Sequence, residues 1–334
     1  MLLQLPTELK INILEHVDKK SLPAVSQTNS TFREITEPIL YSAVILTPFL
    51  EDARRYKTVI ECFRAIVSRP SAAAAVRKLH VSLQHHTKYD SDIVGQVLTA
   101  FGGALPKLGN LERLEIPFWN DRYQYPTGLP RGSPLRSLQH YYGPPEVIDN
   151  IQSNVFVTLR IRSYRLKPSE VSRALLAAAR SNAMALRTLG IRRHEHDDDE
   201  KSLEFMRQIP LLFPNIRFLD LGNWPMTDEH VIDQLIPSLA IMENLRLLKL
   251  MDWWMIDLKD EELHVKRLHQ GCPQLREISL AGSKWRFSEE LRQWAPALRR
   301  RDHDPRTEEI WVKGTHKYLV DPQMDGFDYE FIKY

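Results

Sequence analysis

The chain has 334 residues, of which 43% are hydrophobic, and this is enough apolar material for two domains or for one large repeat domain. Lysine and arginine total 45 against 43 for aspartate and glutamate, so the formal charge of +2 does not indicate nucleic acid or an anionic membrane as partner. The two cysteines, Cys62 and Cys272, form no CxxC pair, which excludes a disulfide framework and a structural zinc set and is typical of a reducing compartment.

The opening segment "LLQLPTELKINILEHV", residues 2–17, reads as one helix with more apolar side chains than a single core can bury. At about 100° per residue, the side chains of Leu9, Ile13, Leu14 and Ile11 span an arc of roughly 200°. This arc is about twice as wide as the stripe that a docked helix needs. We therefore expect part of it to meet a partner chain or the rest of this chain.

The same segment does not read as a targeting sequence. Pro6 and Glu8 interrupt its apolar run at once, and no stretch of the chain reaches the ~18 apolar residues of a membrane span. We therefore expect a cytoplasmic or nuclear protein.

Two further short helices are predicted after the first. One covers roughly 22–28, with Asp18 and Ser21 as candidate N-caps. The other, "TFREITE", has Ser30 or Thr31 as its cap and is expected to stop before Pro38.

The segment from Leu5 to Tyr41 resembles an F-box. It has the Leu-Pro-x-Glu-Leu opening, then an Ile-Leu pair at Ile13 and Leu14, and finally Pro38 followed by Leu-Tyr. The resemblance implies that residues 1–45 form a three-helix unit that binds the Skp-type adaptor of SCF (Skp–cullin–F-box) ubiquitin ligases and, through it, the cullin scaffold.

The resemblance also implies which residues contact the adaptor, because each occupies a position of the F-box motif that has this role. They are Leu5, Pro6, Leu9, Ile13, Leu14, Leu22 and Val25. The alternative is a helical cap in which the same leucines seal the end of the following domain, in a non-ligase protein-interaction scaffold.

The rest of the chain, residues 46–334, carries a recurring pattern of apolar-x-x-apolar-x-apolar. Its eight starts are Val76, Leu111, Leu135, Phe156, Leu186, Ile216, Leu245 and Leu275, and a possible ninth strand lies near Ile310. Helical patterns fall between them at 168–182, 228–241 and 260–271. A strand and a crossover helix every ~30 residues are typical of leucine-rich repeats. The sequence thus predicts an α/β fold, a curved leucine-rich-repeat-like solenoid with a parallel sheet inside and helices outside; another α/β repeat is the alternative.

Side chains alternate along a strand, so the residues between the buried positions face the open side of the sheet. This side is expected to be mildly basic, with apolar patches at Phe218 and Leu247, and to include Gln139 and Tyr141. We assign target binding to Arg160, Arg162, Arg192, Phe218, Asp220, Trp224, Leu247, Lys249 and Trp253. For Trp224 and Trp253, which follow adjacent strands, filling of the core is the alternative to exposed anchoring.

No pattern in the chain indicates a catalytic site. The stretch "RRHEHDDDE", residues 192–200, has metal-binding residue types, but His194 and His196 stand two positions apart rather than four, which favours a polar loop. Neither a Gly-rich phosphate loop nor a Gly-x-Ser-x-Gly elbow occurs. We expect no catalytic residue, no metal and no cofactor.

The last segment, 311–334, is rich in aromatic residues and is predicted to cap the final repeat, with substrate contact as the alternative. Taken together, the sequence predicts a non-catalytic substrate adaptor for a protein target, with neither nucleic acid nor membrane as partner.

Overall fold

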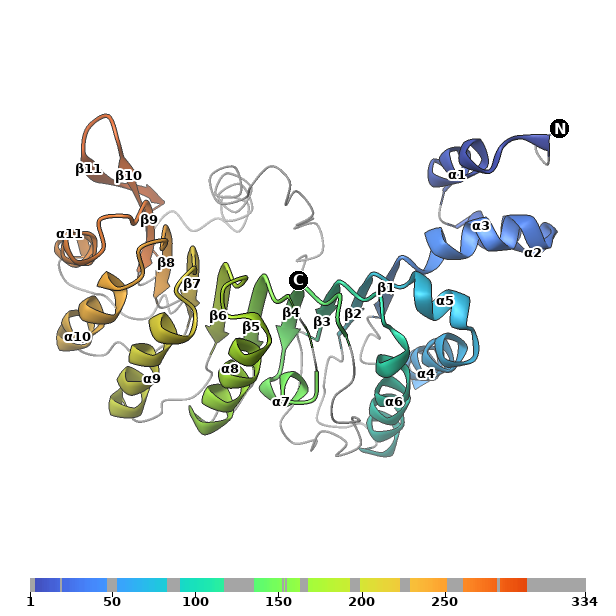
Figure 1. The fold of residues 1–334 in the computed structure, drawn as a ribbon, viewed down its shortest axis with the longest axis horizontal. Coiled ribbons are helices and arrows are strands. Elements are labelled where there is room, and N and C mark those ends of the chain that lie inside the picture. The colour runs from blue at the N-terminus through green and yellow to red at the C-terminus, as the bar shows by residue number, and fades with distance from the viewer. Residues whose placement is uncertain are drawn as a thin grey trace. The chain divides into compact units, whose positions relative to one another are not determined.

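The computed structural model describes residues 4–18, 20–46, 53–82, 91–116, 135–151, 153, 155–162, 168–192, 199–222, 229–250, 261–280 and 283–298 (Figure 1). The chain divides into two compact units, Met1–Ala183 and Met184–Tyr334. The predicted boundary between residues 45 and 46 falls inside the first unit and stays a prediction.

Three helices begin the first unit: α1 (Thr7–Glu15), α2 (Leu22–Thr28) and α3 (Ser30–Tyr41). Leu14, Leu22 and Ile35, one from each helix, form their buried core. Partly buried side chains pack around this core: Val17, Val25, Phe32, Ile39 and Leu40. The predicted three-helix arrangement at the N-terminus is therefore present, with a small core.

Helix α3 differs from its prediction at both ends. Its N-cap is Asn29, whose side-chain oxygen accepts a hydrogen bond from the backbone N–H of Phe32 at 2.8 Å. Pro38 lies inside the helix and does not end it, so the predicted stop was wrong. We attribute this to Ile39 and Leu40, because both pack against the three-helix core only if the helix continues past the proline.

The remainder of the first unit alternates strands with helices. The strands are β1 (Ala43–Leu46), β2 (Lys78–Val81), β3 (Arg113–Glu115), β4 (His140–Gly143) and β5 (Thr158–Arg162). Each pairs in parallel with the next. The helices are α4 (Ala53–Ser68), α5 (Pro70–Ala75), α6 (Ser91–Ala104), the 3-10 helix η2 (Leu105–Lys107), α7 (Pro145–Ile148) and α8 (Pro168–Asn182). Of these, α4, α6, α7 and α8 lie on one side of the strands in Figure 1.

Strand β1 was not predicted and follows α3 directly. Helix α3 also packs on α5, where the Ser71 hydroxyl donates a hydrogen bond to Glu37 at 2.8 Å. The three N-terminal helices are thus attached to β1 by the chain and to α5 by contact.

The second unit repeats the same alternation. Its parallel strands are β6 (Thr188–Arg192), β7 (Phe218–Leu221), β8 (Leu247–Leu250) and β9 (Glu277–Leu280), separated by α9 (Asp199–Leu212), α10 (Glu229–Ala240) and α11 (Glu261–Gly271). The predicted helices at 168–182, 228–241 and 260–271 are confirmed as α8, α10 and α11.

An antiparallel hairpin that was not predicted follows β9. It consists of β10 (Ser283–Ser288), which pairs with β9, and β11 (Gln293–Leu298). The predicted strand near Ile310 and the predicted cap at 311–334 lie outside the described residues. Strands and helices alternate as the sequence predicts; the curved leucine-rich-repeat solenoid stays a prediction.

The third of the eight repeats, which contains β4, starts three residues later than predicted. Tyr141 lies opposite both Leu114 and Leu159, so it occupies the fourth position of the pattern, and Leu138 rather than Leu135 is the first. The expectation that Tyr141 faces the open side was therefore wrong: this residue is 1% exposed.

Tyr141 is accommodated because its neighbour at the sixth position is small. Its hydroxyl donates a hydrogen bond to the Pro144 carbonyl at 2.6 Å. A Cβ on Gly143 would lie 2.7 Å from that hydroxyl oxygen, closer than packed atoms approach. Tyrosine with glycine therefore takes the place that a leucine–isoleucine pair fills in β5.

Candidate functional site

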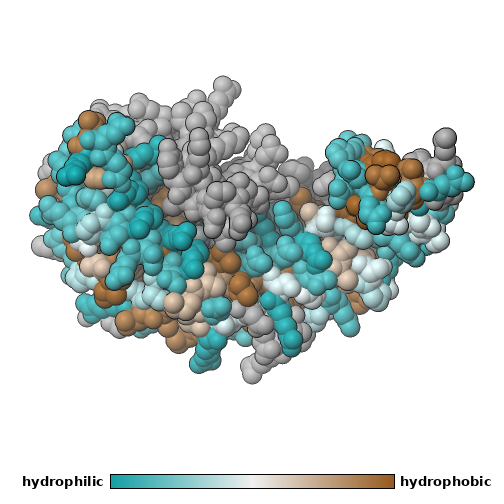
Figure 2. Space-filling view, turned by 45° about the horizontal axis from the view of Figure 1, so that its top comes forward, coloured by the Kyte–Doolittle hydropathy of each residue, from teal (hydrophilic) through white to brown (hydrophobic). Residues whose placement is uncertain are grey.

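Helix α1 carries apolar side chains that its own core does not cover. Leu14 points into the three-helix core, whereas Leu9, Ile11 and Ile13 are 49%, 38% and 44% exposed. Figure 2 shows hydrophobic residues gathered on the N-terminal helices, at the right of the view. We call Leu9, Ile11 and Ile13 the α1 apolar surface.

The local sequence explains how α1 presents this surface. Pro6 occupies the N-cap, where its missing N–H costs no helical hydrogen bond, and its carbonyl accepts from the Lys10 N–H at 3.1 Å. Around the helix, Leu14 holds the inner face, with Leu9 and Ile13 beyond one edge of it and Ile11 beyond the other. Because α1 buries little more than Leu14 in the three-helix core, the apolar side chains on both sides of Leu14 stay exposed to solvent.

The predicted adaptor contacts separate into two groups. Leu9, Ile13 and Pro6 are exposed, while Leu5 and Val25 are half-buried. Leu14 and Leu22, at 5% and 0% exposed, lie in the core and position the helices. The binding role of the whole set stays a prediction. Ile11 was not assigned to the contact, although the width of the apolar arc already included it.

A charged group lies on the strands of the first unit. Glu115 on β3 bonds His80 Nδ1 on β2 at 2.8 Å and accepts a hydrogen bond from Arg113 Nε at 2.5 Å. Burial raises the pKa of the Glu115 carboxyl, but hydrogen bonds from His80 and Arg113 and their charges outweigh burial and lower the pKa to about 2. The carboxylate therefore stays ionised at any physiological pH.

His140, on the adjacent strand β4, reports the positive potential of this group. Burial is the largest cause that lowers the pKa of its imidazole, and the charges of Arg113, Lys78 and Arg160 lower it further, against the opposing charge of Glu115. The resulting pKa of about 4 keeps the ring neutral near pH 7. The charges of Lys78, Arg113 and Arg160 thus lie close enough to this ring to oppose its protonation.

The predicted target-binding residues are only partly described. Arg160 is half-buried on β5. The side chains of Arg162 and Arg192, and the whole of Trp224 and Trp253, lie outside the described residues. The part of these residues in target binding stays a prediction.

Two expectations of exposure in the second unit were wrong. Leu247 is 1% exposed because Phe218 and Glu277 flank it in register on the neighbouring strands. Asp220 is 4% exposed, and its carboxylate accepts a hydrogen bond from the Gly222 N–H at 3.0 Å. Phe218 and Lys249 are half-buried, so they remain the accessible members of this set.

The described part of the chain contains no group of three or more His, Cys, Asp or Glu side chains arranged to hold a metal ion. His194 and His196, with the three aspartates that follow, lie outside the residues whose side chains are described. None of the helices within the described ranges is long and apolar enough to cross a membrane.

Comparison with known protein families matches residues 2–47 to the F-box-like family. The match contains α1, α2, α3 and β1, and therefore includes the α1 apolar surface. A search of curated proteins gave no match.

Proposed function

We propose that this protein is the substrate-recognition adaptor of an SCF-type ubiquitin ligase and performs no chemistry itself. In this proposal, residues 1–45 bind the Skp-type adaptor, which links them to the cullin scaffold, and residues 46–334 bind a protein target. The observation that carries the proposal is an uncovered apolar surface on the first helix of the F-box-like segment.

The physical reason is the free energy that burial of this surface would release. Apolar area contributes about 25 cal/mol per Å² when it leaves water, and clustered aliphatic side chains are suited to the dry centre of an interface. Leu9 and Ile13 lie one turn apart on the same edge of α1, as two contacts for one partner groove. If α1 only capped its own domain, Leu9 and Ile13 would be expected to pack against that domain rather than lie in solvent.

Target binding is proposed for the open side of the strands. Arg160 lies next to the charged group of β2–β4, and Phe218 and Lys249 offer half-buried contacts in the second unit. A bound target would gain ubiquitin through raised effective concentration near the charged enzyme of the ligase, because the adaptor holds both in one assembly.

The test is affinity capture of the Skp-type adaptor by the full chain and by a Leu9→Ala, Ile13→Ala variant. We expect the variant to recover far less adaptor, because truncated interface anchors each cost about 2 kcal/mol or more. A Leu211→Ala, Leu291→Ala variant is the matched control, since these two side chains are 75% and 66% exposed elsewhere. Equal recovery by all three proteins would contradict the proposal.

A second capture separates the ligase machinery from the target. The intact chain and a form without residues 1–45 are compared by mass spectrometry of the captured proteins. We expect the Skp-type adaptor and cullin to be lost on deletion, whereas target proteins are retained. Capture of the adaptor without cullin would favour a non-ligase scaffold instead.

A further inference from the structure

An arginine stands directly before each of the four described parallel strands of the second unit, β6 to β9. These residues are Arg187, Arg217, Arg246 and Arg276, at the second position of four successive repeats. The backbone N–H of each of the last three donates to the carbonyl of the arginine before it, at 2.8, 2.9 and 2.8 Å. The four residues, which we call the arginine row, therefore follow one another at the strand spacing of about 4.8 Å.

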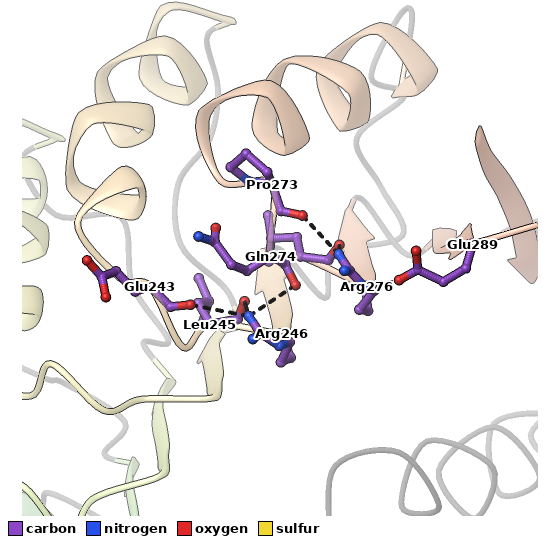
Figure 3. Close-up of polar contacts among 8 residues, drawn as sticks. Glu243, Leu245, Arg246, Pro273, Gln274, Arg276 and Glu289 are labelled. Atoms are coloured by element: carbon purple, nitrogen blue, oxygen red, sulfur yellow. Dashed lines mark hydrogen bonds and ion pairs between the residues drawn. The ribbon is translucent and has the colours of Figure 1, made fainter. Parts of the chain in front are cut away.

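Hydrogen bonds to the turns between helix and strand orient three of these side chains. Arg187 Nη1 donates to the Met184 carbonyl at 2.6 Å, and Arg246 Nη1 donates to the carbonyls of Glu243 and Gln274 at 3.3 and 3.4 Å. Arg276 Nη1 donates to the Pro273 carbonyl at 2.9 Å (Figure 3). A guanidinium has five N–H donors, so each of these groups is fixed in place while it retains donors for a ligand.

The charge of the arginine row is largely uncompensated. Arg276 pairs with Glu289, whose Oε1 lies 2.5 Å from Nε. Among the described residues, no carboxylate forms an ion pair with Arg187, Arg217 or Arg246. Glu243, the acidic residue nearest to Arg246 in the sequence, directs its carboxylate away from Arg246 in Figure 3.

Exposed apolar and amide side chains lie in the same turns. Met184 and Ile241 are 58% and 57% exposed. Asn215 Nδ2 donates to the Met184 carbonyl at 3.1 Å, and Asn244 Nδ2 donates to Asn215 Oδ1 at 3.2 Å. Met184 and Ile241 therefore place exposed apolar area beside the arginine row, and this area suits a protein partner better than a phosphate backbone.

We propose that the arginine row binds an acidic segment of a partner protein, with carboxylates that pair with Arg187, Arg217 and Arg246. The strand spacing of about 4.8 Å is close to the 5–6 Å between side chains on one face of a helix, so a helical acidic segment fits it. The formal charge of +2 for the whole chain gives no broad field for a nucleic acid, which leaves local pairing as the attraction. This surface is distinct from α1 and does not depend on adaptor binding.

The test measures fluorescence anisotropy of a labelled helical peptide with glutamate at every fourth residue, titrated with the full chain at low salt. We expect binding that an Arg187→Gln, Arg217→Gln, Arg246→Gln variant weakens about tenfold, since each exposed pair contributes modestly. A variant with lysine at the same three sites should retain most of the affinity, because lysine keeps the positive charge. It should not retain all of it, because lysine lacks the guanidinium hydrogen bonds. A Lys266→Gln, Arg267→Gln, Arg292→Gln variant removes three charges elsewhere in the unit and should bind like the wild type.

A single charge reversal tests the same proposal if the triple variant does not fold. Arg217 is exposed and its side chain makes no hydrogen bond among the described residues, so Arg217→Glu should fold normally and still weaken peptide binding severalfold. Unchanged affinity of Arg217→Glu would overturn the proposal. So would equal binding of a peptide with glutamine in place of glutamate, or tighter binding of single-stranded DNA or of phosphatidylserine vesicles.

Discussion

Helix α1 and the repeat strands use the same leucine and isoleucine side chains, yet only those of the strands are sealed from water. At the first, fourth and sixth positions of all eight repeats, no apolar side chain is more than 2% exposed. In α1, Leu14 is 5% exposed, while Leu9 and Ile13 are about half exposed. Composition therefore does not separate a buried leucine from an exposed one, whereas a fixed spacing shared by neighbouring segments does.

The largest effect is expected when a buried leucine of a repeat is truncated. Leu219 is fully buried on β7, in register with Leu189 and Leu248. We expect Leu219→Ala to lower the free energy of unfolding by about 2 to 5 kcal/mol, because it removes buried area and leaves a cavity. Urea unfolding followed by circular dichroism measures it, and a loss below about 1 kcal/mol would contradict a sealed repeat core.

Acid should weaken the polar side of the same strands. The pKa of His140 is lowered from 6.5 to about 4 in the folded chain. Between these two pH values the imidazole is protonated in the unfolded chain but neutral in the folded chain, so the free energy of unfolding decreases as pH falls from 6.5 to 4. We expect this to cost roughly 3 kcal/mol by pH 4. For Glu115 a further loss follows as pH falls from 4.5 towards 2.

The measurement is the difference in pH dependence between wild type and His140→Gln, from urea unfolding at pH 7, 6, 5 and 4. The variant cannot take up this proton, so its stability should fall less between pH 6.5 and 4. Parallel curves for the two proteins would show that His140 is not held neutral in the folded state.

The irregular third repeat, which contains β4, offers a smaller test of the shared spacing. Gly143→Ala places a methyl group against the Tyr141 hydroxyl and should destabilise the chain by about 1 to 3 kcal/mol. In a Tyr141→Leu background the space is free, so the same change should cost little. A double-mutant cycle measures this coupling, and simple additivity of the two changes would contradict it.

The smallest effect is expected at α1. Leu9→Ala and Ile13→Ala remove exposed side chains, so each should change the free energy of unfolding by no more than about 0.5 kcal/mol. Thermal unfolding of the two variants beside Leu14→Ala provides the contrast, because Leu14 lies in the three-helix core. A large loss at Leu9 would place it in a core rather than on a binding surface.

Periodicity predicted most of the fold because the repeats reinforce one another. Helices α8, α10 and α11 and the parallel strands from β2 to β9 follow from spacing alone, whereas β1 does not. The third repeat, which contains β4, was assigned three residues early because "LRSLQH" imitates the pattern, whereas the true frame contains tyrosine and glycine. Hairpin β10–β11 follows the last repeat and does not share its spacing, so the repeat signal could not reveal it.

The candidate surfaces were less predictable. The apolar arc of α1 predicted that this helix has apolar side chains its own core does not cover, but the direction of each side chain depends on where α2 and α3 pack. The burial of Leu247 and Asp220 depends on neighbours from other strands and on a local turn. The repeated arginines are visible in the sequence, yet their shared orientation towards the turn carbonyls requires the structure.

The most direct measurement is hydrogen–deuterium exchange of the full chain with and without a purified Skp-type adaptor. With the adaptor bound, slower exchange is expected at the amides of residues 7–15, which carry the α1 apolar surface, and little change at β6–β9. Unchanged exchange in α1, with protection elsewhere in the chain, would contradict docking through this helix.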